Sequence, residues 1–277
     1  MHRNDLKSIW DKNYIQTAFD LNEGLKGDKF HDNTLPMYFT GKRSANTVMV
    51  MLNPGYNNPK YDFSKTEKIK FETFEQFEKS YIESLEKYGI NDIDRLDNFD
   101  LKQAAFLYYS KDEMLKIPRD FWKNSILKKE AKCNVLMNKY QLEFIPYCSR
   151  KFEGVMSSQI QAFDNFKYLE PYLLNVLTEI NSFQREYIIF CSKQFVNLFN
   201  AAEKFPNWNG VFELLDHNSY QEGKLTLSCS KFNINLKGKK LQAIVPHSFA
   251  SQALPNAFEK MSRYGMSCLS MIKTLKS

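Results

Sequence analysis

Four short apolar runs stand out along the chain, and each one ends at polar or turn-forming residues. An unbroken apolar run of this length is typical of a strand that is buried on both faces, as in a parallel sheet. The sequence therefore predicts four buried strands, at residues 48–52, 142–147, 187–191 and 241–245.

The segments between these runs carry apolar residues at helical spacing. Helices are predicted within residues 1–30, 65–87, 123–140, 168–181, 194–200 and 256–273. Residues 88–112 are acidic and predict irregular structure, and the weak alternation of residues 225–236 favours an edge hairpin. Because strands alternate with helices, the predicted fold class is α/β, a three-layer sandwich with a central, mostly parallel sheet flanked by helices.

The length of 277 residues fits one large α/β domain. Residues 1–277 are therefore predicted to form a single domain, with a helical insertion at about residues 60–120. The insertion is expected to lie outside the sheet, where it could reshape or cap a pocket.

Three of the predicted strands lead into polar clusters. The clusters are Asn53-Pro54-Gly55, Ser149-Arg150-Lys151 and His247-Ser248. In open α/β sheets, ligands bind outside the carboxyl ends of parallel strands. We expect the three clusters to share one rim of the sheet, although an ordinary turn is the alternative interpretation of Asn53-Pro54-Gly55.

The charge balance is mildly basic, with 38 Lys and Arg against 32 Asp and Glu and a net charge of +6. This value is compatible with a polyanion partner without identifying one. Lys-rich stretches at residues 123–132 and 237–240 could add DNA affinity that is independent of sequence, although such runs are more often solvated faces.

The five cysteines and four histidines are scattered and show no metal-ligand spacing. Widely spaced cysteines favour free thiols in a reducing compartment. The first residues are charged, and no segment approaches the ~20 apolar residues that a membrane span requires. The sequence therefore predicts a cytoplasmic protein that does not bind a membrane.

Taken in order, these landmarks resemble the uracil-DNA glycosylase superfamily. Its first motif is a strand followed by a short polar turn, and the branch of mismatch-specific uracil/thymine-DNA glycosylases carries Asn-Pro-Gly there, as this chain does at Asn53-Pro54-Gly55. Its last motif is a His-Pro-Ser-type loop after the final strand. That motif appears here as Val245-Pro246-His247-Ser248, with the proline before the histidine. Residues 168–192 are similar to the helix and strand between the two motifs, and the whole resemblance covers roughly residues 35–60 and 140–260.

The resemblance implies a monofunctional DNA glycosylase, which flips a uracil-like or modified base out of the DNA and hydrolyses its N-glycosidic bond. Such an enzyme could act in repair or in defence against modified foreign DNA. Asn53 would orient the attacking water, because an amide is not a general base, and His247 would donate to the base as negative charge develops. The alternatives are a turn-capping amide for Asn53, and a phosphate contact or no role for His247.

The resemblance also implies substrate-binding roles. Pro54 would keep the turn rigid, backbone N–H groups around Gly55 would bind the flipped nucleotide, and Tyr56 would stack on the base unless it is a core or surface residue. Ser149 and Arg150 would contact a base edge or a phosphate, although Arg150 could equally lie in a solvated turn. Ser248 fits phosphate binding through its hydroxyl group.

No cofactor is expected. An iron–sulfur cluster, which some branches of the superfamily hold, needs four suitably placed cysteines, and no cysteine precedes Cys133. A non-catalytic protein that binds nucleic acid or nucleotides with this fold is the alternative function. An unrelated nucleotide enzyme is disfavoured, because the chain has no Gly-x-Gly-x-x-Gly, Gly-x-x-x-x-Gly-Lys-Ser/Thr or Gly-x-Ser-x-Gly motif. The base and the oligomeric state stay open.

Overall fold

A computed structural model describes residues 3–12, 16–23, 30, 35–52, 71–87, 98–111, 130, 134–135, 137–149, 166–247, 249, 254–255 and 257–272. Its helices are α1 (Arg3–Lys12), α2 (Gln16–Glu23), α3 (Phe74–Glu86), α4 (Asn98–Leu107), α7 (Phe166–Asn181), α8 (Gln194–Ala202) and α9 (Phe258–Ser270), with a 3-10 turn at Pro206–Trp208. The strands are β1 (Phe39–Gly41), β2 (Thr47–Met51), β3 (Lys139–Glu143), β4 (Tyr187–Phe190), β5 (Phe212–Glu222), β6 (Leu225–Leu236) and β7 (Lys239–Pro246).

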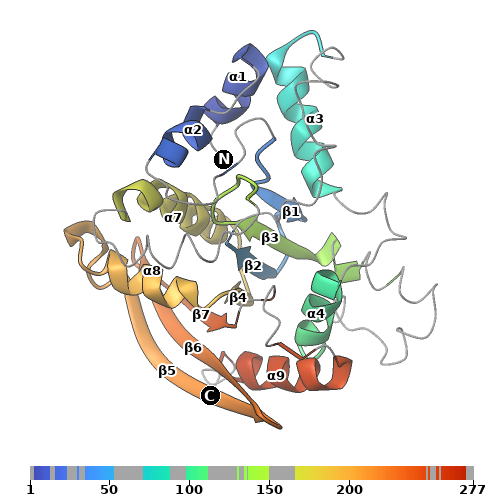
Figure 1. The fold of residues 1–277 in the computed structure, drawn as a ribbon, viewed down its shortest axis with the longest axis vertical. Helices are drawn as coiled ribbons and strands as arrows, with labels where there is room; N and C mark the ends of the chain where they lie inside the picture. The colour runs from blue at the N-terminus through green and yellow to red at the C-terminus, as the bar shows by residue number, and fades with distance from the viewer. Residues whose placement is uncertain are drawn as a thin grey trace.

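Within these ranges the strands form one mixed sheet in the order β1-β3-β2-β4-β7-β6-β5 (Figure 1). The four central strands, β3, β2, β4 and β7, are parallel, with Val48 of β2 paired to Tyr140 of β3 and Ile188 of β4. Strand β1 is antiparallel to β3, and the β6–β5 hairpin continues the sheet antiparallel beyond β7. The predicted α/β class is therefore confirmed, whereas the sheet, predicted to be mostly parallel, is mixed and only partly parallel.

Alternate residues of β2 supply two separate hydrophobic cores, because side chains alternate across a strand. Val48 and Val50 belong to the core that includes residues of α7 and α8, whereas Met49 and Met51 belong to the core that includes residues of α4 and α9. Figure 1 shows the two pairs of helices on opposite sides of the sheet. The molecule thus has three layers, and each fully buried large apolar side chain contributes about 1.5–3 kcal/mol to its stability.

The second helical layer depends on a close approach of α9 to α4. A Cβ atom added at Gly265 of α9 would lie 2.0 Å from the carbonyl oxygen of Phe106 in α4. Only a residue without a side chain allows this backbone-to-backbone packing. Gly265 therefore sets the distance between α4 and α9.

The prediction of irregular structure at residues 88–112 was wrong for residues 98–107, which form helix α4. Consecutive residues Gln103 to Leu107 are all buried, so the segment shows no amphipathic period. The edge hairpin predicted at residues 225–236 is confirmed in part: these residues form the single strand β6, and its hairpin with β5 lies at the edge of the sheet. The edge strand is β5, whose mostly exposed and polar residues gave no strand signal.

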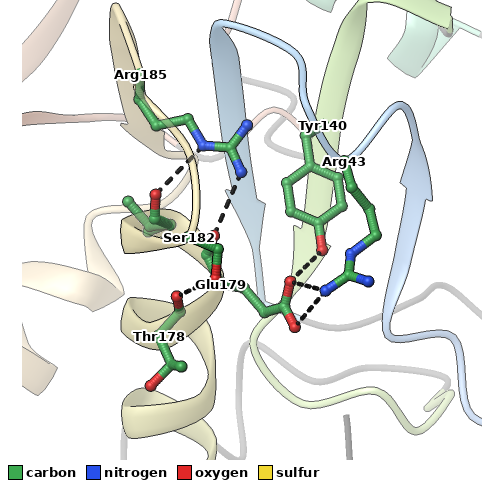
Figure 2. A network of polar contacts seen from close by, with 7 residues as sticks. Arg43, Tyr140, Thr178, Glu179, Ser182 and Arg185 are labelled. Carbon is green, nitrogen blue, oxygen red and sulfur yellow. Dashed lines mark hydrogen bonds and ion pairs between the residues drawn. The ribbon is translucent and has the colours of Figure 1, made fainter.

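A network of polar contacts ties the sheet together at the amino ends of the parallel strands (Figure 2). One nitrogen of Arg43 lies 2.9 and 2.8 Å from the two carboxylate oxygens of Glu179 in α7, and the Tyr140 hydroxyl donates to the same carboxylate at 3.0 Å. Arg185 donates to the backbone carbonyls of Ile180 and Glu179, each at 3.3 Å. These contacts join the segments that precede β2 and β4 to the start of β3.

The helical insertion predicted at about residues 60–120 falls partly outside the described residues. Its described portion contains α3, which packs in the first core, and α4, which packs against α9. Its boundaries stay a prediction. Among the helices that the structure describes, none has both the length and the apolar character needed to cross a membrane.

Candidate functional site at the carboxyl rim of the sheet

The carboxyl ends of β3, β2, β4 and β7 lie along one rim, because these four strands are parallel neighbours. The parallel ladder continues past the assigned strands, because Phe144 N donates to Met51 O at 2.8 Å and Ile145 N donates to Leu52 O at 2.9 Å. On the other side of β2, Cys191 N donates to Val50 O at 2.8 Å. The residue that precedes Asn53 is therefore fixed at the centre of this rim.

The strand order places a topological switch point between β2 and β4. The chain passes from β2 to β3 on one side, and β4 then adds to the opposite side of β2. In doubly wound sheets with this order of parallel strands, ligands bind in the crevice outside the carboxyl ends at the switch point. The end of β2, before Asn53, and the end of β4, at Phe190, are the strand ends that border this point.

Most of the residues predicted for the site lie outside the described ranges. These are Asn53, Pro54, Gly55, Tyr56, Arg150 and Ser248. Their roles stay predictions, anchored by the positions of the described neighbours Leu52, Ser149 and His247.

Ser149 follows the β3 ladder and is turned toward the N-terminal segment. It forms an isolated antiparallel bridge with Phe30 and is 4% exposed. Asn22 of α2 fixes Phe30 in turn, because it donates to the Phe30 carbonyl at 2.6 Å and accepts from the Phe30 N–H at 2.7 Å. A substrate contact by Ser149 would therefore have to be made from a position beside the N-terminal segment.

His247 directly follows β7 and belongs to a ring of three hydrogen bonds with Tyr264 of α9 and Ser228 of β6. The His247 N–H donates to the Tyr264 hydroxyl at 3.0 Å, and that hydroxyl donates to Ser228 O at 2.8 Å. Ser228 N in turn donates to His247 Nδ1 at 3.3 Å. A neutral imidazole whose Nδ1 accepts carries its proton on Nε2, so His247 has an N–H donor at its outer nitrogen.

The hairpin of β5 and β6 extends past the end of β7 and flanks His247. Cys229 is the last β6 residue, toward the hairpin tip, that pairs with β7, and the tip at Gly223-Lys224 lies further out. Glu222 beside the tip contacts Arg263 of α9 at 3.1 Å and Lys260 at 3.6 Å. The β5–β6 hairpin, held by its contacts with α9, therefore borders the rim on its β7 side.

Among the described residues, Lys193 after β4 is an exposed cation at this rim, and Lys224 is exposed at the hairpin tip beyond it. The basic residues Lys239 and Lys240 begin β7 and therefore lie at the opposite end of that strand from His247. The basic run at residues 237–240 consequently does not reinforce the carboxyl rim.

A buried polar ladder runs along β3 on the face covered by α4. The Lys139 ammonium, on a fully buried side chain, donates to Gln103 of α4 and to the Gln141 amide oxygen, the latter at 2.8 Å. Gln141 donates to Glu143 Oε1 at 2.7 Å. The ladder ends at Glu143, which pairs in register with Met51 beside the switch point.

Glu143 is 4% exposed, and its second oxygen, Oε2, is buried without a hydrogen-bond partner in the described part of the structure. Burial raises the pKa of Glu143 to about 8, against the lowering effects of the Gln141 hydrogen bond and the Lys139 charge. An unsatisfied buried polar atom costs about 1–3 kcal/mol. A buried acid with a strongly raised pKa at a strand end is a functional-site candidate.

Sequence reasoning missed Glu143 and the residues after β4. Lys139, Gln141 and Glu143 alternate with buried apolar residues, and this period of two is a signal that the apolar run at residues 142–147 obscured. Ser192, fully buried, accepts from Gln194 N at 3.2 Å and helps to begin α8. Neither residue belongs to a sequence motif.

The arrangement offers an imidazole donor, a carboxylic acid with a pKa near neutrality and an exposed cation along one rim. The described residues contain no group of three or more His, Cys, Asp or Glu side chains placed to hold a metal ion. Comparison with family models, with curated proteins and with solved structures finds no match to this chain.

Proposed function

We propose that the protein is a DNA glycosylase that hydrolyses the N-glycosidic bond of a uracil-like or modified base. The observation that carries the proposal is the common rim of β2, β4 and β7. The residue before Asn53 and the residue His247 are separated in sequence, yet both lie at the carboxyl ends of strands that flank β4. This is the arrangement that the two motifs of the uracil-DNA glycosylase superfamily would need in order to act on one base.

The chemistry assigns different tasks to the two residues. Cleavage of the C–N bond leaves positive charge on the sugar and negative charge on the departing base. Asn53 orients the water that attacks the sugar carbon, and the Nε2–H of His247 donates to the base as its negative charge grows. The exposed cations Lys193 and Lys224 support the proposal, because phosphates on either side of a flipped nucleotide need positive partners.

The experiment is a base-release assay under single-turnover conditions. Single- and double-stranded DNA that carries uracil, a mismatch or a substituted cytosine is incubated with the protein, and abasic sites are detected by alkaline cleavage. We expect release of at least one base. The Asn53→Ala and His247→Ala variants should each lower the rate by about 10²-fold or more, as the loss of an orienting group or of an anion donor does.

Asn233→Ala and His217→Ala are matched controls, because they remove the same residue types from β6 and from the edge strand β5. DNA binding by all variants is measured in parallel at two salt concentrations. No base released from any substrate, with DNA binding intact in every variant, would contradict the proposal and favour a non-catalytic nucleic-acid-binding protein.

A further inference from the structure

The proposed reaction needs a group that can transfer a proton, and the residues predicted from sequence do not include a strong one. The side chain of Asn53 is an amide, which neither gains nor loses a proton near neutral pH. His247 accepts from Ser228 N through Nδ1, and a neutral imidazole that donates through Nε2 is a much weaker acid than a carboxylic acid. The departing base must nevertheless end with a proton in place of its bond to the sugar.

Glu143 has the position and the chemical state for this task. It lies at the carboxyl end of β3 and pairs with Met51, two residues before Asn53. Its Oε1 atom is occupied by the Gln141 amide, whereas no partner is found for its buried Oε2 atom among the described residues. A neutral carboxylic acid held in this way has one free O–H donor.

Burial keeps this acid neutral at neutral pH, and the lowering effects of Gln141 and Lys139 do not offset it. Lys139 is the cation on its own strand, but Gln141 lies between the two side chains and Lys139 is engaged by Gln103 of α4. Cys191 of β4 is the other titratable neighbour, and burial raises the pKa of its thiol, so it brings no negative charge. Burial dominates, which holds the pKa of Glu143 at about 8.

We propose that Glu143, as a neutral carboxylic acid, donates its Oε2 proton to the departing base. This inference rests on the proposed glycosylase function. As the C1′–N bond breaks, its electron pair goes to the base nitrogen, and the base takes the proton of Glu143 at a ring nitrogen or a carbonyl oxygen. The oxygen of the attacking water bonds to C1′, and the proton released by that water restores the acid. Water is the one co-reactant.

The assignment also indicates the class of base. A neutral acid donates its proton to an uncharged acceptor atom. The base should therefore present a carbonyl oxygen or an unprotonated ring nitrogen toward β3. A pyrimidine with carbonyl groups meets this requirement. Glu143 is 4% exposed, so a base that it protonates would have to be removed from water. Water would then not compete with Glu143 as the proton donor.

The test compares single-turnover base release by the wild-type protein and the Glu143→Gln variant between pH 5 and 10. Glutamine keeps the shape and a hydrogen-bond donor but has no acidic proton. We expect the variant to be slower by about 10²-fold at neutral pH. The wild-type rate should fall above pH ~8, where Glu143 ionises, and the variant should lack this alkaline decline.

A second comparison uses the leaving base itself. Uracil is set against a 5-halogenated uracil, whose anion leaves more easily and needs less protonation. The loss caused by Glu143→Gln should be smaller for the halogenated base. Glu143→Asp keeps the acid but shortens its reach, so it should retain the alkaline decline at a lower rate. Glu213→Gln on the exposed edge strand is the matched control, and circular dichroism verifies the fold of each variant.

The outcomes separate the two proposals. An active wild-type protein whose rate and pH profile are unchanged by Glu143→Gln would overturn the role of Glu143 and leave the glycosylase function standing. An active protein in which the variant loses the same factor for both bases, with an unchanged pH profile, would also overturn it. A wild-type protein that is inactive on every base would remove the glycosylase function, and the assignment of Glu143 with it.

Discussion

Strand β3 carries two polar networks, one at Tyr140 near its amino end and one that runs along the strand from Lys139 to Glu143 at its carboxyl end. They differ in whether opposite charges are in direct contact. At the amino end, Tyr140 joins the direct contact of Arg43 with Glu179, in which opposite charges meet at 2.8 Å (Figure 2). In the second network, Gln141 separates the Lys139 ammonium from the Glu143 carboxyl group, and Glu143 is left with an unpaired oxygen among the described residues.

This difference in charge pairing distinguishes side chains that stabilise the fold from side chains that can take part in a reaction. The hydrogen bond to Glu179 raises the pKa of Arg43, and the half-exposed Arg43 also keeps part of its hydration. A buried acid without a direct counter-charge instead shifts toward its neutral form and gains a pKa in the range where proton transfer is efficient. The amino end of β3 therefore serves to lock the sheet, and the carboxyl end retains a reactive group.

The largest expected effect breaks the layer that keeps the carboxyl-end network dry. In the Gly265→Ala variant, the new Cβ would meet the Phe106 carbonyl at 2.0 Å, which forces α4 away from α9. We expect a loss of about 3 kcal/mol or more in the free energy of unfolding by urea, which exceeds the gain of up to ~1 kcal/mol from helix propensity. Met266→Ala, at an exposed position of the same helix, should change stability much less. An equal effect of both variants would contradict the close approach.

The second prediction concerns the pH dependence of stability at Glu143. Between about pH 4.5 and about pH 8, the folded protein keeps the Glu143 proton while the unfolded chain has lost it. Each unit of rising pH in this window therefore costs the wild-type protein up to about 1.4 kcal/mol, and the loss is complete above the folded pKa. The Glu143→Gln variant has no such titration, so it should be more stable than the wild type by several kcal/mol at pH 9 and nearly equal to it at pH 4. Thermal and urea unfolding at both pH values provide the measurement, and a difference that is constant with pH would contradict the raised pKa.

The third and smallest effect tests the amino-end network. Glu179→Gln removes the carboxylate that Arg43 and Tyr140 share, and we expect a loss of about 1–2 kcal/mol in dilute buffer. Because the Arg43 side chain is 41% exposed, the loss should shrink in 1 M salt, whereas the effect of Glu143→Gln should hardly respond to salt. Glu83→Gln on the exposed face of α3 is the control. A salt-independent loss at Glu179 would remove the contrast between the two networks.

The parallel core of the fold was predictable, because buried strands such as β2 and β4 are apolar without interruption and the intervening α7 has a clear helical period. Helix α4 and strand β5 were not predictable from pattern. Leu107 and its neighbours in α4 are buried on every side, and β5 is exposed along most of its length. Neither segment therefore has one apolar and one polar face, which is the pattern from which a helix or strand is predicted.

The candidate site was predictable where chemistry follows directly on a strand, as at His247. Glu143 shows the limit of that approach. Its importance arises from the ladder to Lys139 and from the covering helix α4, which are tertiary features that no local motif encodes. The order of strands, which places the switch point between β2 and β4, likewise depends on pairings that the sequence does not display.

The central place of β2 also has a consequence for how the chain acquires its structure. Val48 finds its partners in Tyr140 and Ile188, so neither neighbour of β2 is close in sequence. Pairings of this kind form slowly, because the entropy of closing a long loop must be overcome before any contact is gained. During synthesis the apolar stretch from Val48 to Met51 emerges with both hydrogen-bonding edges open until β3 and β4 follow. We expect this stretch to be the part of the nascent chain that is most prone to aggregation and that a chaperone would need to shield.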